Sequence, residues 1–294
     1  MMYLLIPHLK VINATAISST YTIGFPAMTA FMGAIHALQR KVTQDERLKE
    51  VRLSKMAVSC HSCMLQTYKG PGDYDFSIIG TSNPLKRKGQ SFERPPFIEE
   101  GRVHLDVSLL VQCDNVHGDD VDFFVERVKN TLRKMKLAGG DILDFGKLEC
   151  MDSSSGEPET EKKILHSLMP GYVLIERKDL LEKEMVAGFD GMEALLSYLA
   201  IEHTAEDDGF QGVRWTSKRK EGGWLVPISV GFKGITPLGK VKEQRNPDAN
   251  HVFAEPLVTL GEFKMAYRFK HIADILWHYE YDENQQLYIC KNEQ

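Results

Sequence analysis

The sequence predicts an α+β protein whose first part has a ferredoxin-like fold, the arrangement that the RNA-recognition motif shares. Three observations support this. An apolar segment with partial alternation opens the chain, two later segments carry apolar residues at helical spacing, and strand-like segments separate them. Together they give the order strand, helix, strand, loop, strand, helix, strand. Because this fold hosts many activities, the order alone assigns no function.

The first strand and the first helix are predicted from the N-terminal 42 residues. Residues 3–17 are apolar with partial alternation, which is typical of a strand. Pro26 follows a polar segment and stands where a helix can begin, since proline is tolerated in the first turn. Apolar residues then recur at helical spacing, at Met28, Phe31, Ile35, Leu38 and Val42.

The rest of the first 150 residues supplies the remaining elements. We expect strands over residues 51–68 and 102–113 and an amphipathic helix over residues 121–136. Between the two strands, residues 70–101 are rich in Gly and Pro, which predicts a protruding loop or hairpin. The second helix should end at "LAGGDIL", where two glycines provide a stop and a turn before a short strand.

The second part of the chain is predicted as an α+β region packed on the first. We therefore expect a domain over residues 1–150, with an insertion at about 68–101, and a C-terminal region over 151–294. Residues 152–163 are polar and acidic and indicate a linker. After it we expect a strand in "PGYVLIERKDLL", a helix in "GMEALLSYLAIEH", a charged loop over 207–223, strands in "GWLVPISVGF" and "FAEPLVTLGEF", and a closing helix in "FKHIADILWHYEY".

Composition narrows the class of protein. Apolar residues make up 43% and charged residues 26%, which is ordinary for a soluble globular chain. No run of eighteen apolar residues occurs, and the N-terminus lacks the basic start of a signal peptide, so we expect a cytoplasmic protein without a membrane span. The net charge of −5 argues against a freestanding nucleic-acid binder. Basic clusters at residues 86–88, 133–136 and 218–220 still allow local phosphate contacts.

Catalytic, metal and cofactor signals are weak. The five scattered cysteines indicate reduced thiols. Cys60 and Cys63 form a C-x-x-C, but no second pair follows, and a strand is the wrong place for a redox motif, so we interpret them as half-buried strand residues. His8, His36 and His104 belong to no recognisable triad, and neither a P-loop nor a dinucleotide fingerprint occurs. We expect no catalytic residue, no metal and no cofactor.

The segment "ISSTYTIGFPAMTA" between the first strand and helix is a candidate binding loop. Backbone N–H groups at a helix start bind anions, and Ser18, Ser19 and Thr22 can add hydroxyl donors. Tyr21 and Phe25 can stack on bases. An ordinary strand-to-helix connection remains the alternative.

A family resemblance extends this interpretation over nearly the whole chain, from about Leu4 to about Tyr279. Its blocks are "NATAISSTYTIGFPAMTAFMGAIHALQR", "SNPLKRKG", "EEGRVHLDVSLL", "LAGGDIL", "GWLVPI", "LGEF" and "ADILWHY" in that order. The chain resembles the Csy-two-like, or Cas-five-type, subunits of type I-F CRISPR Csy complexes, within the RAMP superfamily. The match is poor between Leu148 and Glu221, where this chain is short.

The resemblance implies a non-catalytic subunit that caps the 5′ handle of the CRISPR RNA. Its partners would be the large subunit, as a heterodimer, and the adjacent backbone subunit, with target double-stranded DNA nearby. Target sequence would be read by guide pairing. The insertion resembles a thumb-like hairpin, and Gly139 with Gly140 resembles the glycine-rich loop of the superfamily. The implied RNA-binding residues are Asn13, Ser18, Ser19, Tyr21, Thr22, Phe25, His36, Arg40, Lys86, Arg87, Lys88, Arg102, Lys136, Gly139 and Gly140.

Two other functions remain open at this point. Relatives in the superfamily cut CRISPR RNA, so the chain is alternatively a metal-independent endoribonuclease that depends on His36 or His104. The third hypothesis is a protein-only scaffold without RNA contacts.

Overall fold

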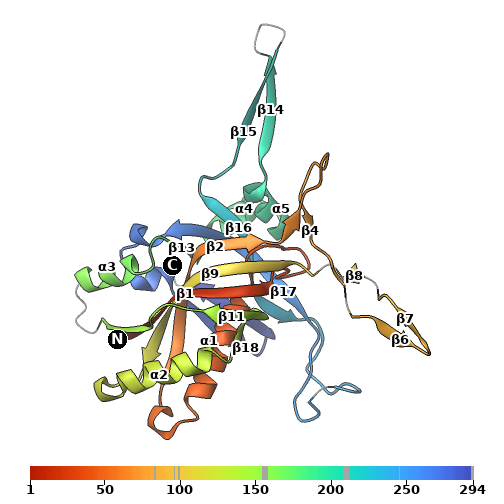
Figure 1. The fold of residues 1–294 in the computed structure, drawn as a ribbon. Helices are drawn as coiled ribbons and strands as arrows, with labels where there is room; N and C mark the ends of the chain where they lie inside the picture. Colours follow the sequence, from red (N-terminus) through yellow and green to blue (C-terminus); the bar gives the residue numbers. More distant parts are fainter. Residues whose placement is uncertain are drawn as a thin grey trace.

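The computed structural model describes residues 1–82, 84–95, 97–98, 100–153, 158–207, 212–244 and 246–292. Within these residues the protein is mixed α/β and is built on one eleven-stranded antiparallel sheet (Figure 1). The order of its strands is β10-β11-β1-β9-β2-β13-β17-β16-β19-β18, and β12 pairs with β1 beside β11. None of the helices in the described parts is long and apolar enough to span a membrane.

The sheet strands come from the whole length of the chain. They are β1 (Met2–Thr15), β2 (Arg52–Leu65), β9 (Arg102–Asp114), β10 (Lys136–Leu137), β11 (Gly140–Asp144), β12 (Glu149–Asp152), β13 (Tyr172–Glu176), β16 (Trp224–Gly234), β17 (Ala254–Met265), β18 (Trp277–Asp282) and β19 (Leu287–Asn292). The helices are α1 (Met28–Val42), α2 (Val121–Leu132), α3 (Pro158–His166), α4 (Lys178–Val186) and α5 (Gly191–Leu199).

Strand β1 is buried on both faces, which explains its nearly continuous apolar sequence. Leu4 and Ile6 belong to the core cluster that contains α1 and α2 residues such as Phe31 and Phe124. Tyr3 and Leu5 point to the opposite face, in a smaller cluster with α3. The apolar stripe predicted for α1 is confirmed, because all five of its expected core positions are buried.

The C-terminal strands close on the N-terminal ones. Strand β2 pairs with β9, with β13 and, through Trp277 opposite Met56, with β18. Strands β2, β13, β17, β16, β19 and β18 therefore form a closed circuit. The fully buried Trp277 donates its Nε1–H to the carbonyl of Leu174 at 2.8 Å, and Ile228 and Phe263 share one core cluster with α1.

Two arms extend from this body (Figure 1). The first arm, within residues 67–98, contains the short ribbons β3 (Thr67–Tyr68) with β4 (Ser77–Ile78), β5 (Thr81–Ser82) with β8 (Phe97–Ile98), and β6 (Lys86–Lys88) with β7 (Ser91–Glu93). It lies where we expected a protruding loop or hairpin. The second arm pairs β14 (Glu202–Asp207) with β15 (Val213–Lys218), where we expected a charged loop. Residues 208–211 of that expected loop lie outside the described residues.

Three other local predictions need correction. The expected closing helix is a 3-10 turn at Ile272–Ile275 followed by β18, because residues 277–282 pair with β19 and Trp277 also pairs with Met56 of β2. Helix α2 ends at Leu132 and not at Lys136, because Lys136 and Leu137 pair with β11. The expected linker is already helical from Pro158, a residue suited to a first helical turn, while its residues 154–157 lie outside the described parts.

Candidate nucleic-acid interface

The candidate binding loop and the predicted glycine loop meet at one groove of about 320 Å³, called here the opening groove. Ser18 and Pro26 line it from one side, and Ala138 and Gly139 from the other. Thr15 ties the two sides together, since its N–H donates to the carbonyl of Ala138 at 2.8 Å. Segments far apart in the sequence therefore form one surface.

The two glycines have different roles. Gly140 is buried, and a Cβ there would lie 2.5 Å from the carbonyl oxygen of Ile12 and 2.7 Å from the nitrogen of Ala14. It permits β11 to approach β1. Gly139 is exposed, lies in the left-handed region at φ +77° and lines the opening groove. Only Gly139 therefore presents its backbone to a ligand.

Helix α1 points its first turn toward the opening groove. Its N-cap is Ala27, which makes no side-chain cap hydrogen bond, and Ala27 and Ala30 line the groove. In the first turn of α1 the N–H of Ala30 donates to the carbonyl of Ala27 at 2.9 Å. The other N–H groups at a helix start have no partner within the helix, and the helix dipole adds positive potential there. The start of α1 therefore suits an anionic oxygen such as a phosphate.

The hydroxyl groups of the binding loop mainly hold the loop itself. Ser18 Oγ and Ser19 Oγ each lie 2.7 Å from Thr22 Oγ1, and Tyr21 N–H donates to Ser19 Oγ at 3.1 Å. Ser19 and Thr22 are buried, so only Ser18 reaches the opening groove.

The two aromatic residues of this loop separate into a surface and a core residue. Tyr21 is 73% exposed, as stacking on a base requires. Phe25 is only 8% exposed; its ring stacks on Phe31 at 5.3 Å and meets Phe263 edge-on at 5.2 Å. The expected base-stacking role of Phe25 therefore conflicts with its place in the core.

A polar network surrounds Asn13, which adopts a positive φ of 55° in β1. Its N–H donates to His104 Nδ1 at 3.1 Å, its side-chain oxygen accepts from Gln66 at 3.0 Å, and its carbonyl accepts from Arg102 at 3.2 Å. Arg102 also pairs with Glu100. Nδ1 of His104 thus accepts a hydrogen bond. Gln66 joins this surface although no pattern in the sequence had indicated it.

The remaining predicted residues lie apart from the opening groove. His36 and Arg40 are exposed on α1, and the His36 ring lies 6.2 Å from that of Tyr279 in β18. Lys136 is exposed in β10 and pairs with Asp141 at 2.8 Å. The structure does not bring His36 together with His104, the two histidines of the nuclease hypothesis.

The three basic residues at 86–88 form β6 near the end of the first arm, where they are exposed (Figure 1). Lys88 Nζ lies 2.8 Å from the Glu93 carboxylate, and Arg87 Nε donates to the carbonyl of Gly89 at 3.1 Å. Exposed pairs of this kind contribute little stability. The cations are therefore available to phosphates.

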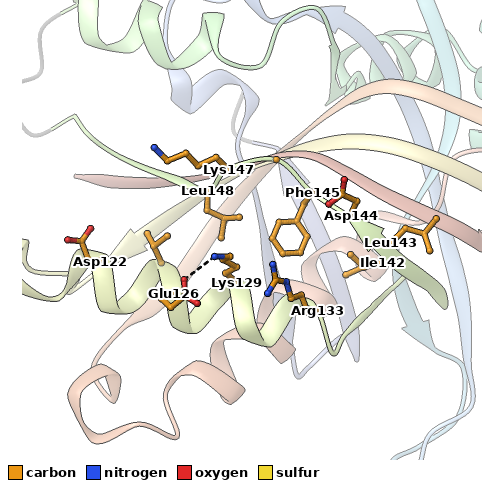
Figure 2. Close-up of a pocket in the computed structure, with 12 residues that line it drawn as sticks. Asp122, Glu126, Lys129, Arg133, Ile142, Leu143, Asp144, Phe145, Lys147 and Leu148 are labelled. Carbon is orange, nitrogen blue, oxygen red and sulfur yellow. Dashed lines mark hydrogen bonds and ion pairs between the residues drawn. The ribbon is translucent and has the colours of Figure 1, made fainter.

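A larger groove of about 680 Å³ lies between α2 and residues 142–148 (Figure 2). Its lining carries both signs of charge, including Asp144, Lys147 and the Glu126–Lys129 pair at 3.2 Å. Mixed charge suits a protein surface better than a phosphate backbone. Apart from Arg133, which belongs to one of the basic clusters, nothing in the sequence had indicated this groove.

The cysteines of the C-x-x-C lie in β2, as interpreted from the sequence. Cys60 is buried, and burial raises the pKa of its thiol to about 12, while Cys63 is exposed. A thiol of that pKa stays protonated near neutral pH and is a poor nucleophile.

Comparison of the sequence with known proteins finds matches among the CRISPR-associated proteins. The family model described as CRISPR-associated protein (Cas_Csy2) matches residues 4–290. The CRISPR-associated protein Csy2 of Pseudomonas aeruginosa (strain UCBPP-PA14) is 31% identical over 315 residues, covering 97% of this chain and 93% of that protein. The chain belongs to the Csy2 family, and the resemblance to type I-F Csy-complex subunits is confirmed.

Proposed function

We propose that this chain is a non-catalytic RNA-binding subunit of a cytoplasmic type I-F CRISPR surveillance complex. It caps the 5′ handle of the CRISPR RNA together with the large subunit and abuts the adjacent backbone subunit. One observation carries the proposal: the uncapped start of α1 and the exposed backbone of Gly139 face the same opening groove. Guide pairing, and not this subunit, then reads the target.

The strand order supports the RAMP assignment. Neighbouring strands run β11-β1-β9-β2, with α1 after β1 and α2 after β9. This order fits the βαββαβ sequence expected of a ferredoxin-like domain, with the first arm inserted between the second and third strands. The C-terminal strands then form the extension that closes on β2.

Handle recognition needs few contacts with a single strand. In the proposed arrangement a phosphate lies at the start of α1, Tyr21 stacks on a base, and the cations of the first arm hold the strand from outside. The half-buried Arg102, paired with Glu100, and the exposed Lys136, paired with Asp141, add positive charge at the margins. The large subunit and the adjacent backbone subunit provide the rest of the positive field, which reconciles RNA binding with a net charge of −5.

The geometry favours this function over the endoribonuclease alternative. His36 is exposed on α1 away from the opening groove, and His104 already accepts a hydrogen bond from Asn13. A general base requires a positioned partner, and these two residues lie on different elements without a shared contact among the described residues. Intact repeat RNA after long incubation with excess protein would exclude cleavage.

A pull-down tests the function directly. The chain is co-expressed with its large subunit and a CRISPR array, and bound RNA is sequenced. We expect RNA with one uniform 5′ end, recovered together with the large subunit. Recovery of the large subunit without RNA would support the scaffold hypothesis. Recovery of neither the large subunit nor RNA would reject the proposed function.

A matched pair of variants then tests the opening groove. Ala30→Glu places a carboxylate among the groove residues, whereas Ala37→Glu adds the same charge to α1 outside the groove. We expect Ala30→Glu to lower RNA recovery strongly, since the carboxylate repels phosphate, and Ala37→Glu to retain it. Equal RNA recovery with both variants would show that the opening groove does not bind the RNA.

A further inference from the structure

Three neighbouring strands bring two histidines and one aspartate together on the sheet face opposite α1 and α2. Asp106 lies in β9, between β1 with His8 and β2 with His61. Side chains alternate along β9, and the residues on either side of Asp106, Leu105 and Val107, belong to the core cluster of α1.

Both histidines occupy irregular positions of their strands. The pairing of β1 with β9 shifts register between Ile6 and Leu9, and the pairing of β2 with β9 shifts between Cys60 and Ser62. His8 moreover has a positive φ of 48°. Bulges re-aim side chains and occur frequently beside functional sites. Here one bulge lies on each side of Asp106, so both imidazoles reach the same place.

The three side chains form a compact cluster. His8 Nδ1 lies 3.1 Å from Asp106 Oδ1, the two imidazole rings stack at 4.3 Å, and one ligand atom from each residue lies within 4.8 Å of the others. The side chain of His8 is about half exposed, which leaves the cluster open to solvent on one side.

We propose that His8, His61 and Asp106 bind a divalent transition-metal ion of the Zn²⁺ class. Two imidazoles and one carboxylate suit such an ion, whereas Mg²⁺ and Ca²⁺ prefer oxygen ligands alone. With three protein ligands and an open side, the ion retains a position for water or an external donor. The site is independent of the proposed RNA groove and departs from the sequence-based expectation of no metal.

A second layer of contacts orients the ligands. Ser108 Oγ accepts the backbone N–H of His8 at 3.1 Å and lies 2.7 Å from His61 Nε2. Gly171 packs against the same imidazole, since a Cβ there would lie 2.9 Å from His61 Cε1. Nε2 of His61 is therefore already engaged by the Ser108 hydroxyl, and a metal ion bound to this nitrogen would replace that hydrogen bond. Ser108 thus orients the His61 ring and the His8 backbone beside Asp106.

A bound ion would join β1, β9 and β2, the strands that carry the core. Binding to the folded state alone stabilises it by mass action, so metal should raise the unfolding temperature of the chain. This readout does not depend on RNA, and a failure here would leave the proposed RNA function untouched.

The experiment uses the full chain after dialysis against a chelator. ZnCl₂ is titrated by calorimetry, and CoCl₂ is used for its visible absorption spectrum. We expect one ion per chain and a rise in unfolding temperature. His8→Gln and Asp106→Asn should abolish both. His166→Gln, an exposed histidine on α3, is the matched control and should bind like the parent chain.

Two results would overturn the proposal. One is the lack of saturable binding by the parent chain. The other is equal binding by the parent chain, His8→Gln and Asp106→Asn, which would place the ion elsewhere. His8 is exposed and Asp106→Asn is nearly isosteric, so both variants are expected to fold, and circular dichroism checks this.

Discussion

The chain up to Asp152 and the chain from Pro158 onward contribute to the same sheet in different ways. The first part forms β11-β1-β9-β2 with two helices on one face. The second part adds five strands that return to β2, so its outer strand β18 touches a strand of the first part. The elements of the first part follow from local helical and strand patterns in the sequence. The strands of the second part are instead fixed by pairing with segments that are distant in the sequence.

The largest expected effect comes from breaking the closure between the two parts. Trp277→Ala removes a fully buried ring and leaves the carbonyl of Leu174 without its indole donor. We expect a loss of about 3–5 kcal/mol in the free energy of unfolding, measured by urea denaturation. Trp215→Ala in the second arm removes the same side chain where it is 66% exposed and should change stability by at most about 0.5 kcal/mol. Similar losses in both variants would contradict a shared core.

A smaller effect is expected at the packing of β11 on β1 within the first part. Gly140→Ala places a Cβ 2.5 Å from the carbonyl of Ile12 and should cost about 1–3 kcal/mol as overpacking. Gly33→Ala on the exposed face of α1 meets no atom within 4 Å and should instead stabilise the chain by about 0.5–1 kcal/mol. Thermal unfolding of both variants measures the difference, and a tolerated Gly140→Ala would contradict the close approach.

The contrast between the two parts also explains what could be predicted from the sequence. Helix α1 was predicted because its apolar residues recur every three or four positions. The first arm was predicted because its Gly and Pro residues leave neither a helical nor a strand pattern. Strand β18 was missed because "DILWHYEY" is compatible with a helical and with a strand pattern, and its pairing with β19, together with Trp277 opposite Met56, decides between them. Strand β19 gave no signal.

The candidate site was predictable to a similar degree. Ser18 and Gly139 were found because a polar loop before a helix and a glycine pair have recognisable patterns. Gln66 and His61 were not, because their roles arise where strands from different parts of the sequence lie side by side. The burial of Phe25 likewise depends on Phe263, which is supplied by the second part of the chain.

The two arms allow a comparison on RNA. Lys86→Glu with Arg87→Glu reverses two exposed cations in the first arm. If each contacts a phosphate of single-stranded RNA, affinity falls and the slope of log K against log salt flattens by about 1.4. Arg214→Glu with Lys218→Glu makes the same charge change in the second arm and should leave the slope unchanged. Fluorescence anisotropy on the assembled complex over a salt series measures the affinity and the slope for both double variants. Equal changes in the two variants would mean that these cations act through the overall charge of the protein and not through phosphate contacts.

The smallest effect concerns the reactivity of the cysteines. It should distinguish an exposed cysteine of β2 from cysteines buried in the core that both parts of the chain share. Cys60 in β2 and Cys290 in β19 are buried, and burial raises the pKa of each thiol to about 12. Burial raises the pKa of the Cys63 thiol as well, but Cys63 is exposed to the reagent. The thiolate is the reactive form, so at pH 8 Cys60 and Cys290 should resist iodoacetamide, and Cys63 should be modified before them. Raising the pH increases the thiolate fraction and should speed the reaction of Cys63 before that of the buried pair. Peptide mass spectrometry measures the order, and urea should make Cys60 and Cys290 as reactive as Cys63. If Cys290 in the folded chain were modified as fast as Cys63, β19 would have to open. The pairing of β18 with β2 at Trp277 would then hold the two parts together less firmly than we infer.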